Sequence, residues 1–180
     1  MIKKIEHEKN STVCIERFNY SNIDLKHLLS PLGGIKSYVK HGEKVLIKVN
    51  LLNASIPEQA VITHPNLIKS VVKEVLEIGG IPYIGDSPSG QFSKRRLDKV
   101  YKRAGLIELA NELGIELNYN TSSTKMNITD GVRLKKAPIC NFVLNADKII
   151  ALPKLKTHSF MIMTLATKIM YGAIPGLTKA

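Results

Sequence analysis

The feature that most constrains the fold is a strand–helix–strand pattern in the first half of the chain. Residues 44–51 form an apolar strand pattern, and residues 65–76 then repeat apolar side chains at helical spacing. A proline suits the first position of that helix, and a pair of glycines ends it. A second short strand is expected at 81–84. The crossover in such a βαβ unit is right-handed, so both strands end on the same rim of one sheet.

The remaining segments continue the alternation of strands and helices. We expect a single α/β domain over residues 1–180, with a mostly parallel, Rossmann-like open sheet flanked by helices. A polar loop over 120–131, with a minor hairpin through 132–134, interrupts the alternation. Further strands are expected at 12–18, at 115–119 and from Lys148 onward, and further helices at 23–29, 93–103 and 106–113.

Composition argues against several classes of protein. Hydrophobic residues make up 44% of the 180 residues, and no apolar run reaches the roughly 18–20 residues that a membrane span requires. The N-terminal residues show no apolar segment typical of a secretory signal, so we expect a cytoplasmic protein without a membrane partner. Cys14 and Cys140 are interpreted as small buried hydrophobic residues, and no metal site is predicted.

The formal charge of +11 and the pI near 9.7 raise nucleic acid as a partner. The one concentrated group of cations lies in the predicted helix 93–103. Aromatic residues are only 6% of the chain and tryptophan is absent, so few side chains could stack on single-stranded bases. A small anionic ligand explains the lysines in the loops equally well.

A group of polar and cationic residues follows the last predicted strand. A proline ends that strand, and four such residues come directly after it: Lys154, Lys156, Thr157 and His158. In open α/β sheets, ligands bind outside the carboxyl ends of the strands, and lysine suits phosphate or carboxylate. The sequence therefore predicts an anion site here, and Lys168 in the following apolar segment joins it. The alternatives are a solvated loop and, for Lys168, a side chain that snorkels to the surface.

Three other segments should reach the same rim, and they contain Asn50, Thr63 with His64, and Asp86. Asn50 follows the first strand of the βαβ unit, and Thr63 lies just before its helix, so both are predicted to hydrogen-bond the ligand. Lys48, inside the first strand, is predicted to add a positive charge.

Two histidines are candidates for proton transfer, His158 and His64. Asp86 follows the second strand of the βαβ unit, and it would orient whichever histidine faces it across the rim. The alternative for His64 is that it only caps the helix that begins after it. No spacing of histidine and glutamate residues supports a metal site.

Several strings in this sequence resemble the domain of unknown function 362 family. They are K-V-N-L at 48–51, T-H-P at 63–65, G-D-S at 85–87 and P-K-L-K-T-H at 153–158. Four single residues follow in the family's order: Thr164, Lys168, Gly172 and Lys179. The resemblance covers about residues 44–179.

The resemblance implies an α/β domain that often belongs to a longer chain, so this sequence is interpreted as a short form or the first half of a larger protein. Many members look redox-associated, because a ferredoxin-type segment with clustered cysteines accompanies the domain. This sequence lacks that segment, so cluster binding does not carry over. Val49 and Ile169 stand where the family usually has proline and asparagine, and the second difference removes a polar group beside Lys168.

Three hypotheses for the function follow. The first is an enzyme-like domain that binds a small phosphate- or carboxylate-bearing ligand at the strand-end rim. The second is a non-catalytic module that partners an iron–sulfur or redox protein. The third is a nucleic-acid-binding protein that uses the basic helix 93–103. Neither the residues nor the resemblance identifies a reaction or a cofactor.

Overall fold

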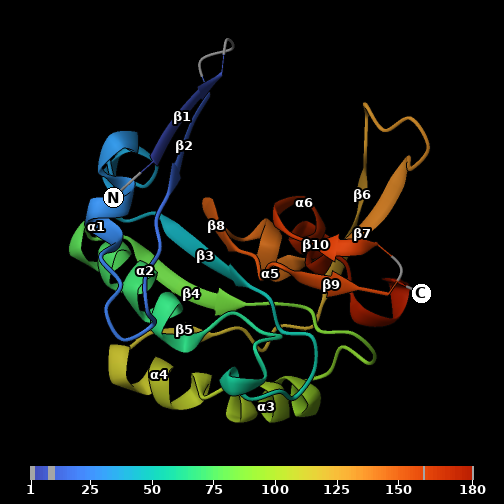
Figure 1. Ribbon diagram of the computed structural model, residues 1–180. Coiled ribbons are helices and arrows are strands. Elements are labelled where there is room, and N and C mark those ends of the chain that lie inside the picture. Colours follow the sequence, from blue (N-terminus) through green and yellow to red (C-terminus); the bar gives the residue numbers. More distant parts are fainter. Residues whose placement is uncertain (1–2, 8–10, 160, 180) are drawn as a thin grey trace.

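A computed structural model describes residues 3–7, 11–159 and 161–179, with side chains from Thr12 onward (Figure 1). The strands are β1 (Lys3–His7), β2 (Ser11–Ile15), β3 (Lys44–Val49), β4 (Ile81–Gly85), β5 (Glu116–Leu117), β6 (Ser123–Asn127), β7 (Lys136–Cys140), β8 (Lys148–Leu152), β9 (Lys156–His158) and β10 (Ile162–Thr164). The α-helices are α1 (Leu25–Leu29), α2 (Pro65–Glu77), α3 (Lys94–Arg103), α4 (Leu106–Leu113), α5 (Asn141–Leu144) and α6 (Ala166–Ile169). Short 3₁₀ helices are Ser30–Leu32, Ile35–Ser37, Pro57–Gln59, Met170–Ala173 and Gly176–Lys179.

A four-stranded parallel sheet with the order β5-β4-β3-β8 organises the molecule. Its register pairs Lys48 with Gly85 on one side and with Ala151 on the other. The chain first adds β4 and β5 to one edge of β3, and it later returns to add β8 to the opposite edge. This reversal between β3 and β8 is a topological switch point, where α/β sheets leave a crevice at the carboxyl ends of the strands. The predicted α/β fold with a parallel sheet is confirmed.

One face of the sheet is covered by helices. Figure 1 shows α2, α3 and α4 together on this side. The side chains of Val45, Ile47 and Val49 alternate along β3 toward these helices and are fully buried. Helix α2 packs against these side chains with a buried apolar stripe that includes Val72 and Val75. The predicted start of α2 at Pro65 is correct, and His64 caps it.

The opposite face carries a much smaller apolar cluster. Leu46 of β3 packs there with Cys140 and Phe142, which lie at the β7–α5 junction. Gly85, at the end of β4, makes room for this packing. A Cβ atom built on Gly85 would lie 2.8 Å from the Phe142 ring and 3.1 Å from Leu46 Cδ1. The chain from β9 to its last described residues gathers beside this face, near the carboxyl ends of the strands (Figure 1).

Three predictions about strands need correction. The predicted hairpin through 132–134 is instead a wider one, in which β6 pairs antiparallel with β7 and residues 128–135 form the connection. The expected strand at 12–18 ends at Ile15, and β2 pairs with β1 rather than joining the main sheet. The segment after Pro153 is not only a loop, because β9 and β10 pair as an antiparallel hairpin. In the described part of the chain, no helix is both long and apolar enough to cross a bilayer.

Candidate functional site

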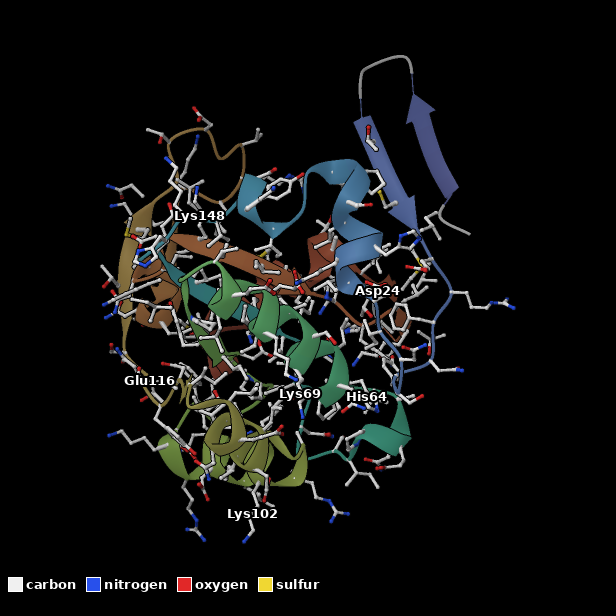
Figure 2. The ribbon with its side chains drawn as sticks, turned by 90° about the vertical axis from the view of Figure 1, so that its left-hand side faces the viewer. Asp24, His64, Lys69, Lys102, Glu116 and Lys148 are labelled. Carbon is white, nitrogen blue, oxygen red and sulfur yellow. The ribbon has the colours of Figure 1, made fainter. Side chains whose placement is uncertain are left out.

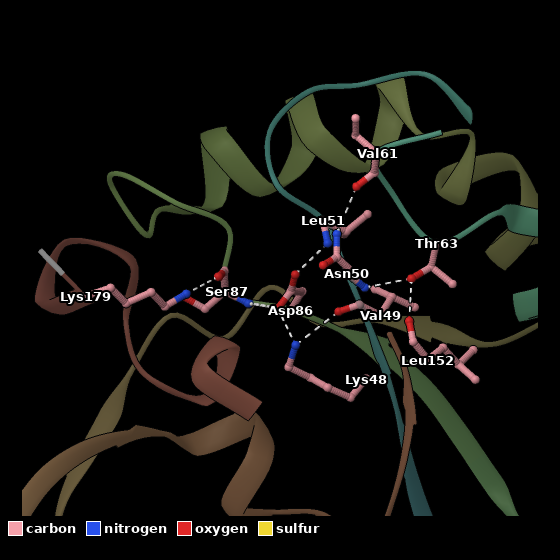
Figure 3. A network of polar contacts seen from close by, with 10 residues as sticks. All are labelled: Lys48, Val49, Asn50, Leu51, Val61, Thr63, Asp86, Ser87, Leu152 and Lys179. Carbon is pink, nitrogen blue, oxygen red and sulfur yellow. Dashed lines mark hydrogen bonds and ion pairs between the residues drawn. The ribbon is translucent and has the colours of Figure 1, made fainter. Parts of the chain in front are cut away.

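A buried ion pair lies at the carboxyl ends of β3 and β4 (Figure 3). Because Lys48 pairs in register with Gly85, the next residue after β4, Asp86, comes beside the lysine ammonium group. Lys48 is only 1% exposed and Asp86 only 4%. Lys48 Nζ donates hydrogen bonds to Asp86 Oδ1 and, at 3.1 Å, to the carbonyl of Val49. Two charges removed from water in this way stabilise each other only as a pair.

The carboxylate of Asp86 is fixed by backbone groups as well. The backbone N–H of Leu51 donates to Asp86 Oδ2 at 2.7 Å, and the N–H of Ser87 donates to Oδ1 at 2.8 Å. These bonds satisfy a buried anion that would otherwise be costly. They also attach the loop after β3 to the loop after β4. The ion pair therefore lies at the base of the site formed by the ends of these strands.

A second polar junction joins β3 to β8 through Thr63. Its hydroxyl donates to the carbonyl of Leu152 at 2.7 Å and accepts from the backbone N–H of Asn50 at 2.8 Å. The Asn50 side chain donates to the carbonyl of Val61 at 3.1 Å. Thr63 is 2% exposed, so its hydroxyl holds the two strand ends together inside the protein. This contact explains why a threonine stands just before α2.

A cleft of about 110 Å³ opens above the ion pair. It lies at the switch point between β3 and β8, with the loop after β4 on one side and the chain after β8 on the other. Four lysines and one carboxylate supply its charged side chains. The lining residues are Lys48, Asn50, Leu51, Leu52, Asp86, Ser87, Ser89, Lys156, His158, Thr164, Lys168, Ile169, Tyr171, Gly172 and Lys179.

The lysines of the cleft are crowded and partly desolvated. Burial lowers the pKa of Lys156, and repulsion from Lys168 lowers it further. Burial lowers the pKa of Lys179 to about 8; the negative charge of Asp86 opposes this shift, and the positive charge of Lys48 adds to it. Lys156 Nζ donates to the carbonyl of Val61 at 2.7 Å. The cleft therefore presents positive charge in an environment that does not fully solvate it.

The β9–β10 hairpin places the predicted P-K-L-K-T-H residues. Side chains alternate along β9, so Lys156 and His158 reach the cleft, whereas Thr157 lies between them on the exposed side. His158 Nδ1 accepts a hydrogen bond from the backbone N–H of Met161 at 3.1 Å. Thr164 Oγ1 donates to the carbonyl of Lys154 at 2.7 Å, which ties β10 to the chain that enters β9.

His64 and Lys154 lie together at a different place, next to Tyr20. The His64 ring stacks on Tyr20 with centroids 3.8 Å apart, and its Nδ1 accepts from the backbone N–H of Asn66 at 3.1 Å as a helix cap. Lys154 Nζ lies 5.5 Å from the centre of the Tyr20 ring and donates to its hydroxyl at 3.2 Å. Burial and then the charge of Lys154 lower the pKa of His64. Figure 2 shows His64 at the beginning of α2.

The structure thus brings together six of the residues predicted for the site and leaves four outside the cleft lining. Those that line the cleft are Lys48, Asn50, Asp86, Lys156, His158 and Lys168. Those outside it are His64, Lys154, Thr157 and Thr63, the last of which supports the rim from within.

Comparison with known proteins identifies the family to which this chain belongs. The family model of the domain of unknown function DUF362 matches residues 45–180. This chain is a DUF362 protein. It is 38% identical over 162 residues to the thylakoid-associated protein sll1697 of Synechocystis, an alignment that covers 87% of this chain and 47% of that relative. The chain thus spans less than half the length of this relative. No solved structure matches.

Two residues of this DUF362 chain, Lys179 and Gly172, complete the cleft although neither was predicted as a site residue. Lys179 Nζ donates to the carbonyl of Ser87 and, at 3.3 Å, contacts the Ser87 hydroxyl (Figure 3). A Cβ atom on Gly172 would lie 2.5 Å from both Lys48 Nζ and Asp86 Oδ1, so only glycine lets the backbone approach the ion pair this closely. Both are among the single residues that follow the family's order in the sequence, and this resemblance was the signal that could have identified them.

The two positions where the DUF362 chain departs from the expected pattern also lie at the site. The carbonyl of Val49 accepts the second hydrogen bond of Lys48, and the Val49 side chain is buried on the helical face. Ile169 is buried and forms part of the cleft wall, which is therefore apolar beside Lys168.

The described histidine, cysteine and acidic side chains of this DUF362 chain are dispersed. In the described ranges, no three histidine, cysteine, aspartate or glutamate side chains gather closely enough to hold a metal ion. Cys140 is buried, as expected, and burial raises the pKa of its thiol to about 11. Cys14 is only half-buried.

Proposed function

We propose that the cleft binds a small anionic ligand that carries a phosphate or carboxylate group. The observation that carries the proposal is the imbalance of charge in the cleft. Its one carboxylate, Asp86, is already paired with Lys48, whereas Lys156, Lys168 and Lys179 line the same space. An anion placed among three ammonium groups gains charge-assisted hydrogen bonds and reduces their mutual repulsion.

The size of the cleft supports a compact ligand group. Pockets that enclose drug-sized molecules measure roughly 300–1,000 Å³. A cleft of about 110 Å³ holds one phosphate or carboxylate group with a short attached chain. The rest of a larger ligand would extend into solvent past Leu52 and Tyr171, which are exposed at the mouth of the cleft.

His158 is the side chain best placed for proton transfer in this proposal, because it lines the cleft beside the lysines. Asp86 has a different role from the one expected from the sequence. Its oxygens accept from Lys48 and from two backbone N–H groups, so it fixes the floor of the site and balances the charge of Lys48.

Calorimetric titration with sodium phosphate and with sodium citrate at low ionic strength tests this proposal. We expect saturable binding, and we expect Lys156→Ala and Lys168→Ala each to weaken it at least about tenfold, which corresponds to about 1.4 kcal/mol. Lys125→Ala is the matched control, because Lys125 is an exposed lysine on β6 outside the cleft. Equal affinities for the wild type and the two cleft variants would refute the proposal.

Helix α3 favours a second candidate function, the binding of nucleic acid. It buries Leu97, Val100 and Tyr101 toward the sheet and turns a row of cations outward. Figure 2 shows Lys102 projecting from this outer layer. The exposed cations of α3 are Lys94, Arg95, Lys99, Lys102 and Arg103. Phosphate-backbone contacts of this kind bind without sequence preference.

Salt dependence distinguishes the two candidates. If α3 binds a duplex, fluorescence anisotropy should show the affinity falling by orders of magnitude between about 50 and 200 mM salt. The double variant Lys99→Glu/Lys102→Glu should then abolish duplex binding and leave phosphate binding in the cleft unchanged. The absence of duplex binding at low salt would eliminate this second candidate.

A further inference from the structure

Lys179 differs from the other lysines of the cleft in its surroundings. Its ammonium nitrogen is held against the loop after β4 by the carbonyl and hydroxyl oxygens of Ser87, yet it still lines the open cleft. The charged and titratable groups that act on it come from three other elements and one loop: Lys48 on β3, Cys140 on β7, Lys168 on α6, and Asp86 after β4. A partly buried amine beside other cations is the environment that turns lysine into a nucleophile.

We infer that Lys179 forms a Schiff base with a small carbonyl compound that carries a carboxylate or phosphate group. This inference rests on the proposed function, because the anionic group must first be held by Lys156 and Lys168. Lys156, Lys168 and Lys179 all line this one cleft, so a ligand held by the first two lies in the space that Lys179 also borders. A ligand small enough for the cleft of about 110 Å³ then holds its carbonyl carbon in the space that Lys179 lines.

The step is balanced without any added oxidant or reductant. The lone pair of the neutral Lys179 amine attacks the carbonyl carbon, and the carbonyl π electrons move to oxygen. Transfer of a proton from nitrogen to that oxygen gives a carbinolamine. Loss of water then leaves a C=N bond to Lys179, and protonation of its nitrogen gives the iminium ion. The Ser87 hydroxyl and His158 are the cleft groups able to carry these protons.

The acidity of Lys179 supports the chemistry, since only the neutral amine attacks. With a pKa of about 8, half of the Lys179 side chains are neutral at pH 8. An ordinary lysine, with a pKa of 10.5, is neutral in roughly 0.3% of molecules at that pH. The reactive neutral form of Lys179 is therefore about 100-fold more abundant at pH 8 than that of an exposed lysine.

Reductive trapping tests the inference directly. The wild-type chain is incubated with glyoxylate and sodium cyanoborohydride at pH 8, and the modified residue is located by peptide mass mapping. We expect one carboxymethyl group per chain on Lys179, formed at least about tenfold faster than modification of Lys125, and slowed by inorganic phosphate as a competitor. Lys179→Arg, which keeps the positive charge, should abolish this fast modification, whereas Lys125→Arg should not.

A parallel titration with glycolate separates the two proposals. Glycolate has the carboxylate of glyoxylate and a hydroxyl in place of the aldehyde, so it reports anion binding alone. If glycolate binds but glyoxylate labels lysines over the whole surface at similar rates, the Schiff-base inference is wrong and the anion site stands. If glycolate does not bind and no lysine is labelled preferentially, both proposals fail. Because the mapping uses the wild-type chain, these outcomes do not depend on the folding of a variant.

Discussion

The two faces of the central sheet differ in what they bury. Among the residues that the structure describes, 19 buried hydrophobic residues form one continuous core on the helical face, whereas the buried cluster on the opposite face consists of Leu46, Cys140 and Phe142. The same strand, β3, serves both faces, because its side chains alternate. Ile47 lies in the large core, and the neighbouring Lys48 lies in the ion pair under the cleft. The apolar burial that stabilises this fold is therefore concentrated on one side of the sheet.

This difference indicates how the fold stays stable although one face holds a cluster of lysines. The helical face supplies enough hydrophobic burial that the other face can hold a lysine–aspartate pair and several further lysines. Residues of the two faces should therefore respond differently to substitution. On the helical face, a substitution should lower stability by removing packing contacts. On the opposite face, which carries the ion pair under the cleft and is called the cleft face below, it should lower stability by leaving a charge unbalanced.

The largest effect is expected when the charge balance of the cleft face is broken. Asp86→Ala leaves the ammonium group of Lys48 buried without its partner, and we expect the free energy of unfolding to fall by roughly 3–5 kcal/mol. Urea unfolding at pH 7 measures it. The double variant Lys48→Met/Asp86→Leu should recover much of the loss, since no charge then remains buried. A loss under about 1 kcal/mol for Asp86→Ala would show that water reaches the pair.

A comparable loss is expected from the helical face for a different reason. Ile47→Ala opens a cavity in the main core and should cost roughly 2–5 kcal/mol. Ile149→Ala on β8 is the matched control, because Ile149 is 39% exposed and its truncation should cost less than 1 kcal/mol. Urea unfolding of both variants sharpens the comparison. Similar losses for the two would contradict the assignment of the core to one face.

The junction that Thr63 makes between the ends of β3 and β8 should show an intermediate effect. Thr63→Val keeps the shape of the side chain but removes the hydroxyl that joins Asn50 to Leu152, so we expect a loss of about 1–3 kcal/mol. Thr63→Ser retains the hydroxyl and serves as the control. If both variants unfold at the same urea concentration, the hydroxyl does not hold β3 and β8 together.

The last effect expected is a change of stability with pH that arises at the cleft. Lys179 has a pKa of about 8 in the folded protein, below the 10.5 of an ordinary lysine, so the folded state binds fewer protons than the unfolded state between these values. Stability contributed by this residue therefore rises as the pH increases from 8 to 10.5. Thermal unfolding of the wild type and of Lys179→Met measures the difference between the two profiles. Parallel profiles would contradict this assignment.

The sequence was sufficient where the signals are local. The periodicity of 65–76 with its flanking proline and glycines predicted α2 with its correct first residue, because helix propensity and capping act within a few residues. The βαβ geometry then implied that the ends of β3 and β4 meet. The contact of Asp86 with Leu51 shows that they do.

The sequence was insufficient where distant segments decide the structure. His64 and Lys154 were expected at the rim, but Tyr20 from the N-terminal part of the chain lies against both of them. No local sequence pattern predicts the contact between Tyr20 and Lys154, which are 134 positions apart. The same applies to Lys179 and Ser87, which are 92 positions apart. The ligand and catalytic roles assigned to the cleft residues stay predictions until binding is measured.

The position of β8 has a consequence for how the molecule folds. Strands β3, β4 and β5 lie close in sequence and can assemble early, but β8 pairs with β3 across about 100 residues of chain. Until β8 pairs with it, β3 has one edge of unpaired backbone groups, in a strand whose apolar side chains include Val45, Ile47 and Val49. Unpaired apolar edges of this kind recruit other strands, so newly made chains should be most prone to aggregation during this interval. The last strand to dock thus both protects the sheet and creates the crevice in which the cleft forms.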